Sequence, residues 1–101
     1  MSTVAVAIAS LIHLYPGYVT KVACEGRLLV SAVGNDQLVV LSALPKELGC
    51  GVLLKPVGAA GRTNLLLETS TGAVSRVIEI GPGKTAPGPS ALSYRLKEDR
   101  R

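Results

Sequence analysis

The chain has 101 residues, of which 48% are hydrophobic, so it is not wholly disordered and its length suits one domain. It contains three Tyr but no Phe or Trp, so its core must be built from Leu, Val, Ile and Ala. The formal net charge is +4, of which +3 falls on the residues from Pro82 onward and +1 on the 81 residues before them. A nearly neutral body argues against broad electrostatic binding to nucleic acid.

Neither a membrane-spanning helix nor an intact signal peptide is expected. No stretch approaches the roughly 20 apolar residues that a membrane-spanning helix needs. Residues 1–9 are small and apolar, but no basic residues precede them, as they would in a signal peptide. Removal of a natural leader before Met1 would leave the same sequence.

The first half of the chain predicts a series of short strands joined by turns. In residues 3–14 and 18–23 successive side chains divide between two faces, which is the pattern of strands. Turn signals such as Tyr15-Pro16-Gly17 and Gly34-Asn35-Asp36 separate them. Pro45 and Gly49 are placed to begin and end a single helical turn. The expected strands are residues 3–14, 18–23, 27–33 and 37–42.

Residues 51–80 predict three further strands, and the rest of the chain is organised around them. Pro56 is expected to end the first strand. Residues 65–67 are three consecutive Leu, which predicts a central strand covered on both faces. The last strand alternates, with one side formed by Val74, Arg76, Ile78 and Ile80. The three expected strands are residues 52–54, 63–69 and 74–80.

Turn signals recur about every 8–12 residues and no long helical pattern is present, which predicts an all-β fold. We expect a small sandwich or partly open barrel of about seven short strands, with a Pro/Gly-rich C-terminal tail. Residues 81–90 contain three Pro and three Gly, the composition of a linker. The sequence thus divides into a β-domain, residues 1–81, and a flexible linker with a basic tail, residues 82–101.

The tail contains one segment with a strand pattern. Leu92, Tyr94 and Leu96 recur at a spacing of two, which gives an extended segment one apolar face. Such a segment, tethered by a linker, can complete an exposed sheet edge, because the edge presents unpaired N–H and C=O groups. We expect these residues to dock on a sheet edge, either of the same chain or of a neighbouring subunit. The alternative is a disordered tail.

Two cysteines, Cys24 and Cys50, leave two alternatives open. Their spacing fits no zinc pattern, and the single His13 is distant from both in sequence. A disulfide between them would close a loop of about 25 residues and stabilise the fold by about 3 kcal/mol. Alternatively, both are buried thiols that act as small hydrophobic residues.

No pattern in the sequence predicts an enzyme site, a metal or a cofactor. Residues 81–85, Gly-Pro-Gly-Lys-Thr, lack the first glycine of a phosphate-binding loop, and the prolines after them prevent the helix that such a loop requires. The glycine-bearing loop at residues 58–64 is interpreted as a turn, with Arg62 in solvent or paired with a carboxylate. His13 has no evident nucleophile and acid beside it, since Ser10 and Glu25 match by residue type alone.

Several short motifs resemble a known group of domains. A turn contains Leu14, Pro16 and Gly17, an apolar segment reads Leu-Leu-Lys-Pro-Val at residues 53–57, and a closing strand carries Gly61, Thr63, Asn64 and Leu65. Together they resemble the N-terminal β-domain of pilus-assembly secretins and the related domain of the TrbG/TraK group of type IV secretion. The resemblance spans about three quarters of the chain, but residues 23–49 and both cysteines depart from it.

The resemblance implies a non-enzymatic module of a bacterial secretion, pilus or conjugation apparatus. Its partners would be protein subunits of the same apparatus, including further copies of the chain in a ring, with no small-molecule substrate. We expect it in the periplasm or at the outer membrane if a leader has been removed, and in the cytoplasm otherwise. The alternative is a small nucleic-acid-binding barrel, although three Tyr offer few surfaces on which bases could stack.

Overall fold

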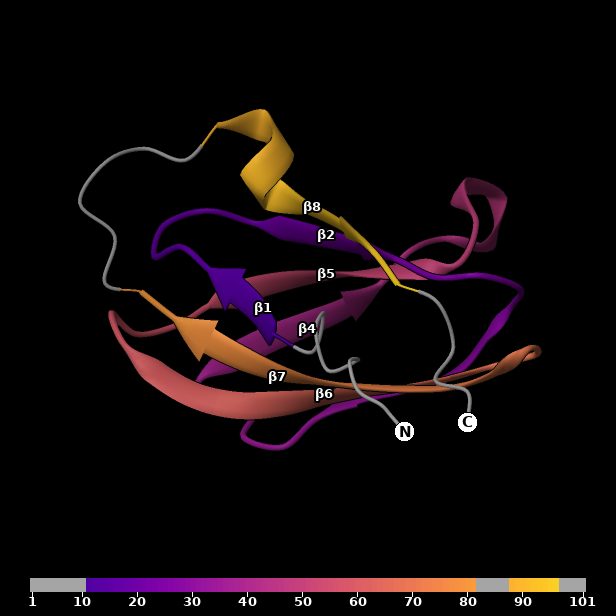
Figure 1. Cartoon of the computed structure of the whole chain (residues 1–101), viewed down its shortest axis with the longest axis horizontal. Helices are drawn as coiled ribbons and strands as arrows, with labels where there is room; N and C mark the ends of the chain where they lie inside the picture. The colour runs from indigo at the N-terminus through magenta and orange to yellow at the C-terminus, as the bar shows by residue number, and fades with distance from the viewer. Residues whose placement is uncertain (1–10, 82–87, 97–101) are drawn as a thin grey trace, which may run out of the picture.

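The computed structural model describes residues 11–81 and 88–96, which form two β-sheets packed face to face (Figure 1). Eight strands and two short 3₁₀ helices lie within these residues. Along the chain the elements are β1 (Leu11–Leu14), β2 (Thr20–Ala23), β3 (Leu28–Val33), β4 (Val39–Ala43), η1 (Lys46–Leu48), β5 (Gly51–Pro56), β6 (Gly61–Thr69), β7 (Gly72–Ile80), η2 (Pro89–Leu92) and β8 (Ser93–Arg95).

Each sheet has four strands. The order is β1-β7-β6-β3 in the first sheet and β4-β5-β2-β8 in the second. Neighbouring strands are antiparallel except for β1 beside β7 and β8 beside β2, which are parallel. The predicted all-β fold is therefore confirmed, and of the two expected architectures the structure is the sandwich.

The strand order is that of an immunoglobulin-type sandwich, in which strands A-B-E-D form one sheet and C-F-G the other. Strands β2, β5 and β4 occupy the places of B, E and D, and β3, β6 and β7 those of C, F and G. The place of strand A beside β2 is taken by β8, from the other end of the chain, whereas β1 lies on β7. This architecture hosts many unrelated functions, so it does not by itself indicate one.

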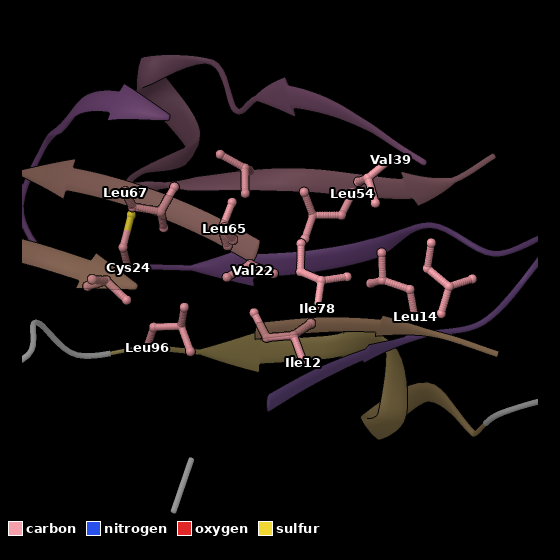
Figure 2. Close-up of a cluster of buried hydrophobic side chains, with 13 residues drawn as sticks. Ile12, Leu14, Val22, Cys24, Val39, Leu54, Leu65, Leu67, Ile78 and Leu96 are labelled. Carbon is pink, nitrogen blue, oxygen red and sulfur yellow. The ribbon is translucent and has the colours of Figure 1, made fainter. Parts of the chain in front are cut away.

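The core lies between the sheets and consists almost entirely of branched aliphatic side chains (Figure 2). These residues alternate along their strands, because successive side chains of a strand point to opposite faces of the sheet. Burial of each contributes roughly 1.5–3 kcal/mol relative to exposure. The largest fully buried hydrophobic side chains are those of Ile12, Leu14, Leu54, Leu65, Leu67, Ile78 and Ile80.

Strand β7 has the predicted alternation. Val74, Ile78 and Ile80 are buried on the inner side. Arg76 lies on that side too and is half-buried, with its Nη1 donating to the carbonyl oxygen of Ser75 at 2.8 Å. Arg76 therefore occupies a position on the inner face of β7 between the buried apolar residues Val74 and Ile78.

Two details of the sequence prediction are wrong. Leu66 is only half-buried, because β6 is central in its sheet but no second layer of the described residues covers its outer face. The strand expected at residues 52–54 is longer, because β5 spans Gly51–Pro56; it ends at Pro56, as expected, and Pro56 is the register partner of Val39. A proline lacks an N–H group, but this costs little at the end of a strand. Of the strand expected at residues 3–14, the first eight residues lie outside the described part.

Candidate interaction edges

Cys24 and Cys50 form a disulfide, with their Cα atoms 5.0 Å apart. They lie where β2 ends and β5 begins, and the Cys24 N–H donates to the Cys50 carbonyl at 3.0 Å. This backbone hydrogen bond extends the antiparallel β2–β5 pairing by one step beyond the pair Ala23 and Gly51. Of the two alternatives left open by the sequence, the structure has the disulfide. The loop that it closes contains β3, β4 and η1.

The motif Gly61, Thr63, Asn64 and Leu65 forms the first half of β6. Leu65 is fully buried. The Asn64 carbonyl accepts a hydrogen bond from the Gly34 N–H at 3.0 Å, which extends the β3–β6 pairing by one step. A side chain at Gly34 would overlap the side chains of Thr63 and Asn64, so these residues pack against the turn after β3. In this chain the motif therefore packs against the turn after β3 and holds it by a backbone hydrogen bond.

The tail segment docks on the edge of its own sheet. Strand β8 lies parallel to β2, with Tyr94 beside Val22, and the Leu96 N–H donates to the Ala23 carbonyl at 2.8 Å. Leu96 is 5% exposed and belongs to the core cluster, and Leu92 is half-buried. Although the sequence assigns these residues to the tail, residues 88–96 are part of the sandwich.

One side of the sandwich, where β1 and β8 are the edge strands, is bridged between the sheets. The Tyr94 hydroxyl accepts a hydrogen bond from the backbone N–H of His13, at 3.0 Å. The His13 ring also contacts the ring of Tyr15, with the centroids 4.7 Å apart and the ring planes tilted by 59°. We refer to β1 and β8 as the closed side, because a side chain from one sheet satisfies a backbone group of the other.

On the opposite side, the edge strands are β3 and β4, and we refer to these two strands as the open side. Each pairs with only one strand within the described residues, β3 with β6 and β4 with β5. Neither strand contains a charged residue or a proline. Leu29, Val30 and Val40 are 57%, 45% and 50% exposed. A shift of register between Leu28 and Val30 marks a bulge at the start of β3.

Natural sheet edges are commonly protected by charges, prolines or bulges. The open side has only the bulge, and the three residues of β3 after Val30 and all of β4 lack such protection. Both strands are predicted by the sequence, but their position at the edges of the sheets is not. The signal that was available is the absence of charge from residues 28–33 and 39–43, whereas β6 and β7 each carry both signs.

The outer faces of the two sheets differ in charge. The sheet β4-β5-β2-β8 contains three exposed cations, Lys21, Lys55 and Arg95, and no acidic residue. In the other sheet Arg62 pairs with Glu79, at 3.7 Å between Nη2 and Oε1, and both side chains are substantially exposed. This confirms the interpretation of Arg62 as a surface residue paired with a carboxylate. Exposed pairs of this kind contribute little to stability.

The remaining candidate sites do not come together. The phosphate-loop-like residues 82–85 and Ser10 lie outside the described residues. Within residues 11–81 and 88–96, no group of three or more His, Cys, Asp or Glu side chains is placed to hold a metal ion. In the same ranges, no helix has the length and apolar character that crossing a bilayer requires.

No protein-family model matches the chain, and no curated protein matches its sequence. The resemblance to secretion and pilus-assembly domains therefore rests on the short motifs that carry it.

Proposed function

We propose that the chain is a non-enzymatic structural module that assembles with further protein subunits by pairing strands at its open side. The observation that carries this proposal is the uncharged double edge formed by β3 and β4. An edge strand offers N–H and C=O groups along its length, and an added strand satisfies them while its side chains cover the neighbouring apolar residues.

The exposed side chains of the open side favour a protein strand as the partner. Leu29 and Val30 on β3 and Val40 on β4 are each about half exposed or more, and no charge lies within either strand. A strand of five or six residues spans about 17–20 Å. Its partner would be an extended segment of similar length with apolar side chains. The partner that we commit to is a second copy of this chain.

The resemblance to domains of envelope-spanning machines agrees with such a role. Scaffold subunits of a secretion, pilus or conjugation apparatus act by ring assembly or docking, with no chemistry of their own. The disulfide between Cys24 and Cys50 supports a periplasmic location, because such bonds persist in oxidising compartments. We therefore propose that the chain belongs to an apparatus of this kind.

A competing proposal, single-stranded nucleic-acid binding, draws on the cations Lys21, Lys55 and Arg95. Proteins of that class generally add aromatic side chains on which bases stack. In the described part of the chain, the strands of this sheet contain one aromatic residue, Tyr94, which pairs in register with buried Val22 and bonds to His13. Titration with a labelled oligonucleotide at two salt concentrations separates the proposals, because true binding weakens steeply with salt.

The experiment for the open side is to substitute Val40→Lys and Val30→Lys and to measure mass by light scattering over a concentration series. We expect the unaltered chain to associate as its concentration rises, and the two variants to stay monomeric, because a lysine on an edge strand opposes strand addition. Leu48→Lys and Val57→Lys are the matched controls, since these residues are 67% and 60% exposed and lie outside the strands of the open side.

The free energy of unfolding of the monomer is a second quantity to measure for the same variants. Because all four residues are exposed, each substitution should change the free energy of unfolding by no more than about 0.5 kcal/mol. Loss of association with unchanged stability would support pairing at the open side. An unaltered chain that stays monomeric at every concentration, or equal association of edge and control variants, would contradict it.

A further inference from the structure

Helix η2 and strand β8 form a small unit that pairs along the outer edge of β2, and Tyr94 and Leu96 also contact β1 and the core. Strand β8 has three residues and its register partners are Lys21, Val22 and Ala23 of β2. The unit is joined to β7 only through residues 81–88, whose sequence is Gly-Pro-Gly-Lys-Thr-Ala-Pro-Gly. In Figure 1 this unit, in yellow, lies along β2 on the far side of the second sheet from β4.

The contacts that hold this unit come from elements near the other end of the chain. Leu96 is buried in the core and its N–H bonds to Ala23, and the Tyr94 hydroxyl bonds to the His13 N–H. None of these contacts depends on the connection between β7 and η2. They would form equally well if β8 came from another copy of the chain, which is the condition for exchange of an identical element between subunits.

The length of the linker from Gly81 to Gly88 determines whether β8 pairs with β2 of its own chain or with β2 of another copy. From Gly81 to Gly88 an extended chain reaches about 22 Å at about 3.1 Å per residue. That is less than the smallest extent of the molecule, 25 Å, so an exchanging copy must lie directly beside this one. A short linker gives its own strand an effective concentration of about 1 mM. The population of the exchanged form therefore becomes comparable to that of the unexchanged form, in which β8 pairs with β2 of its own chain, when neighbouring copies reach that local concentration.

We propose that the outer edge of β2 is an acceptor site for the β8 strand of a second copy, so that copies exchange their C-terminal strands. The proposal concerns the closed side and does not depend on pairing at the open side. Reciprocal exchange gives a dimer, and exchange in one direction gives a head-to-tail ring or filament.

The test uses two full-length variants, Lys21→Cys and Ser93→Cys, whose altered residues are exposed register partners on β2 and β8. They are mixed in equal amounts at about 1 mM, equilibrated, and treated with a short bifunctional thiol reagent, which leaves the native disulfide intact. At this concentration about half of the β8 strands should be exchanged, so about a quarter of the strands that carry Ser93→Cys should be linked to a copy that carries Lys21→Cys. The yield should fall in proportion on dilution.

Two controls make the result decisive. A mixture of Lys21→Cys with Leu48→Cys measures random cross-linking, because Leu48 is highly exposed and lies on η1. The double variant with both Lys21→Cys and Ser93→Cys measures closure within one chain. If the double variant closes but the mixed variants cross-link no more than the Leu48 control, β8 does not exchange and the proposal is wrong. If the double variant does not close either, β2 is no acceptor for this strand, which also overturns the proposal.

Adding Val40→Lys to both variants separates this proposal from the proposed function. The open-side substitution should leave the cross-linking yield unchanged, because Val40 is on β4, at the opposite edge of the sheet from β8. If Val40→Lys abolishes cross-linking, β8 exchanges only between copies that are already paired at the open side. Strand exchange would then depend on open-side pairing, which contradicts the proposal.

Discussion

The two sides of the sandwich end their sheets in different ways. On the closed side, residues that are 81 positions apart in the chain, His13 and Tyr94, join the two edge strands through one hydrogen bond. On the open side, β3 and β4 follow each other in the chain, and the edge of each carries exposed aliphatic side chains. Within residues 11–81 and 88–96, the two sheets are therefore joined by a hydrogen bond between β1 and β8, whereas β3 and β4 expose aliphatic side chains at their edges.

The open and closed sides also differ in their relation to the disulfide. The loop closed by Cys24 and Cys50 holds the open-side strands β3 and β4, whereas β1 and β8 lie outside it. Strands without a second neighbour gain stability from a covalent constraint on the unfolded chain. The closed side has no such constraint and depends on side-chain burial, including that of Ile12, Leu14 and Leu96.

The largest effect is expected from Leu96→Ala. Removing a fully packed Leu from a core typically costs about 2–5 kcal/mol, because a cavity remains where the side chain was. Leu92→Ala is the matched control, since Leu92 is half-buried in the same segment and should cost clearly less. Urea denaturation followed by circular dichroism measures both. Equal midpoints for Leu96→Ala and the unaltered chain would mean that the tail segment does not hold the closed side together.

Loss of the disulfide should come next. Reduction, or replacement of Cys24 and Cys50 by Ser, removes a constraint worth about 3 kcal/mol. For a domain of this size the melting temperature should fall by roughly 10 °C or more, which calorimetry with and without reductant can measure. Hydrogen exchange should increase more in β3 and β4 than in β1 and β7, because only the former lie within the disulfide loop. Unchanged melting after verified reduction would contradict this account of the open side.

A smaller effect is expected from Tyr94→Phe. The substitution removes the hydroxyl that accepts the His13 N–H but keeps the ring, so the cost should be about 1 kcal/mol. Tyr18→Phe is the control, because Tyr18 lies in the turn before β2 and is exposed. Denaturant midpoints compare the two. If Tyr94→Phe is as stable as Tyr18→Phe, the bridge between the sheets contributes nothing and the closed side is held by burial alone.

Much of the fold could be predicted from the sequence because it depends on local patterns. The alternation in residues 74–80 and the turns at Pro16-Gly17 and Gly34 depend on neighbouring residues only, and each strand predicted within the described residues is present. The single helical turn between Pro45 and Gly49 is also present, as η1. These features follow from two-residue periodicity and from the backbone preferences of Pro and Gly.

The parts that could not be predicted depend on contacts between distant residues. Nothing in Leu11–Leu14 indicates that this strand lies parallel to β7, and nothing in residues 28–33 shows that they form an edge. The run of Leu at residues 65–67 suggested cover on both faces, but a central strand of a sandwich has only one covered face. For the tail, the spacing of Leu92, Tyr94 and Leu96 indicated docking without specifying β2 as the acceptor.

The parallel pairing of β1 with β7 has a mechanical consequence. Four register pairs, from Leu11 with Val77 to Leu14 with Ile80, join these strands, and the Gly81 N–H adds a bond to the Leu14 carbonyl at 2.9 Å. When parallel strands are pulled from the start of one and the end of the other, the force runs along both and loads all the bonds together. Antiparallel strands pulled from adjacent ends would instead separate one bond at a time. A subunit that transmits tension through β1 and β7 would therefore resist stretching as a single unit.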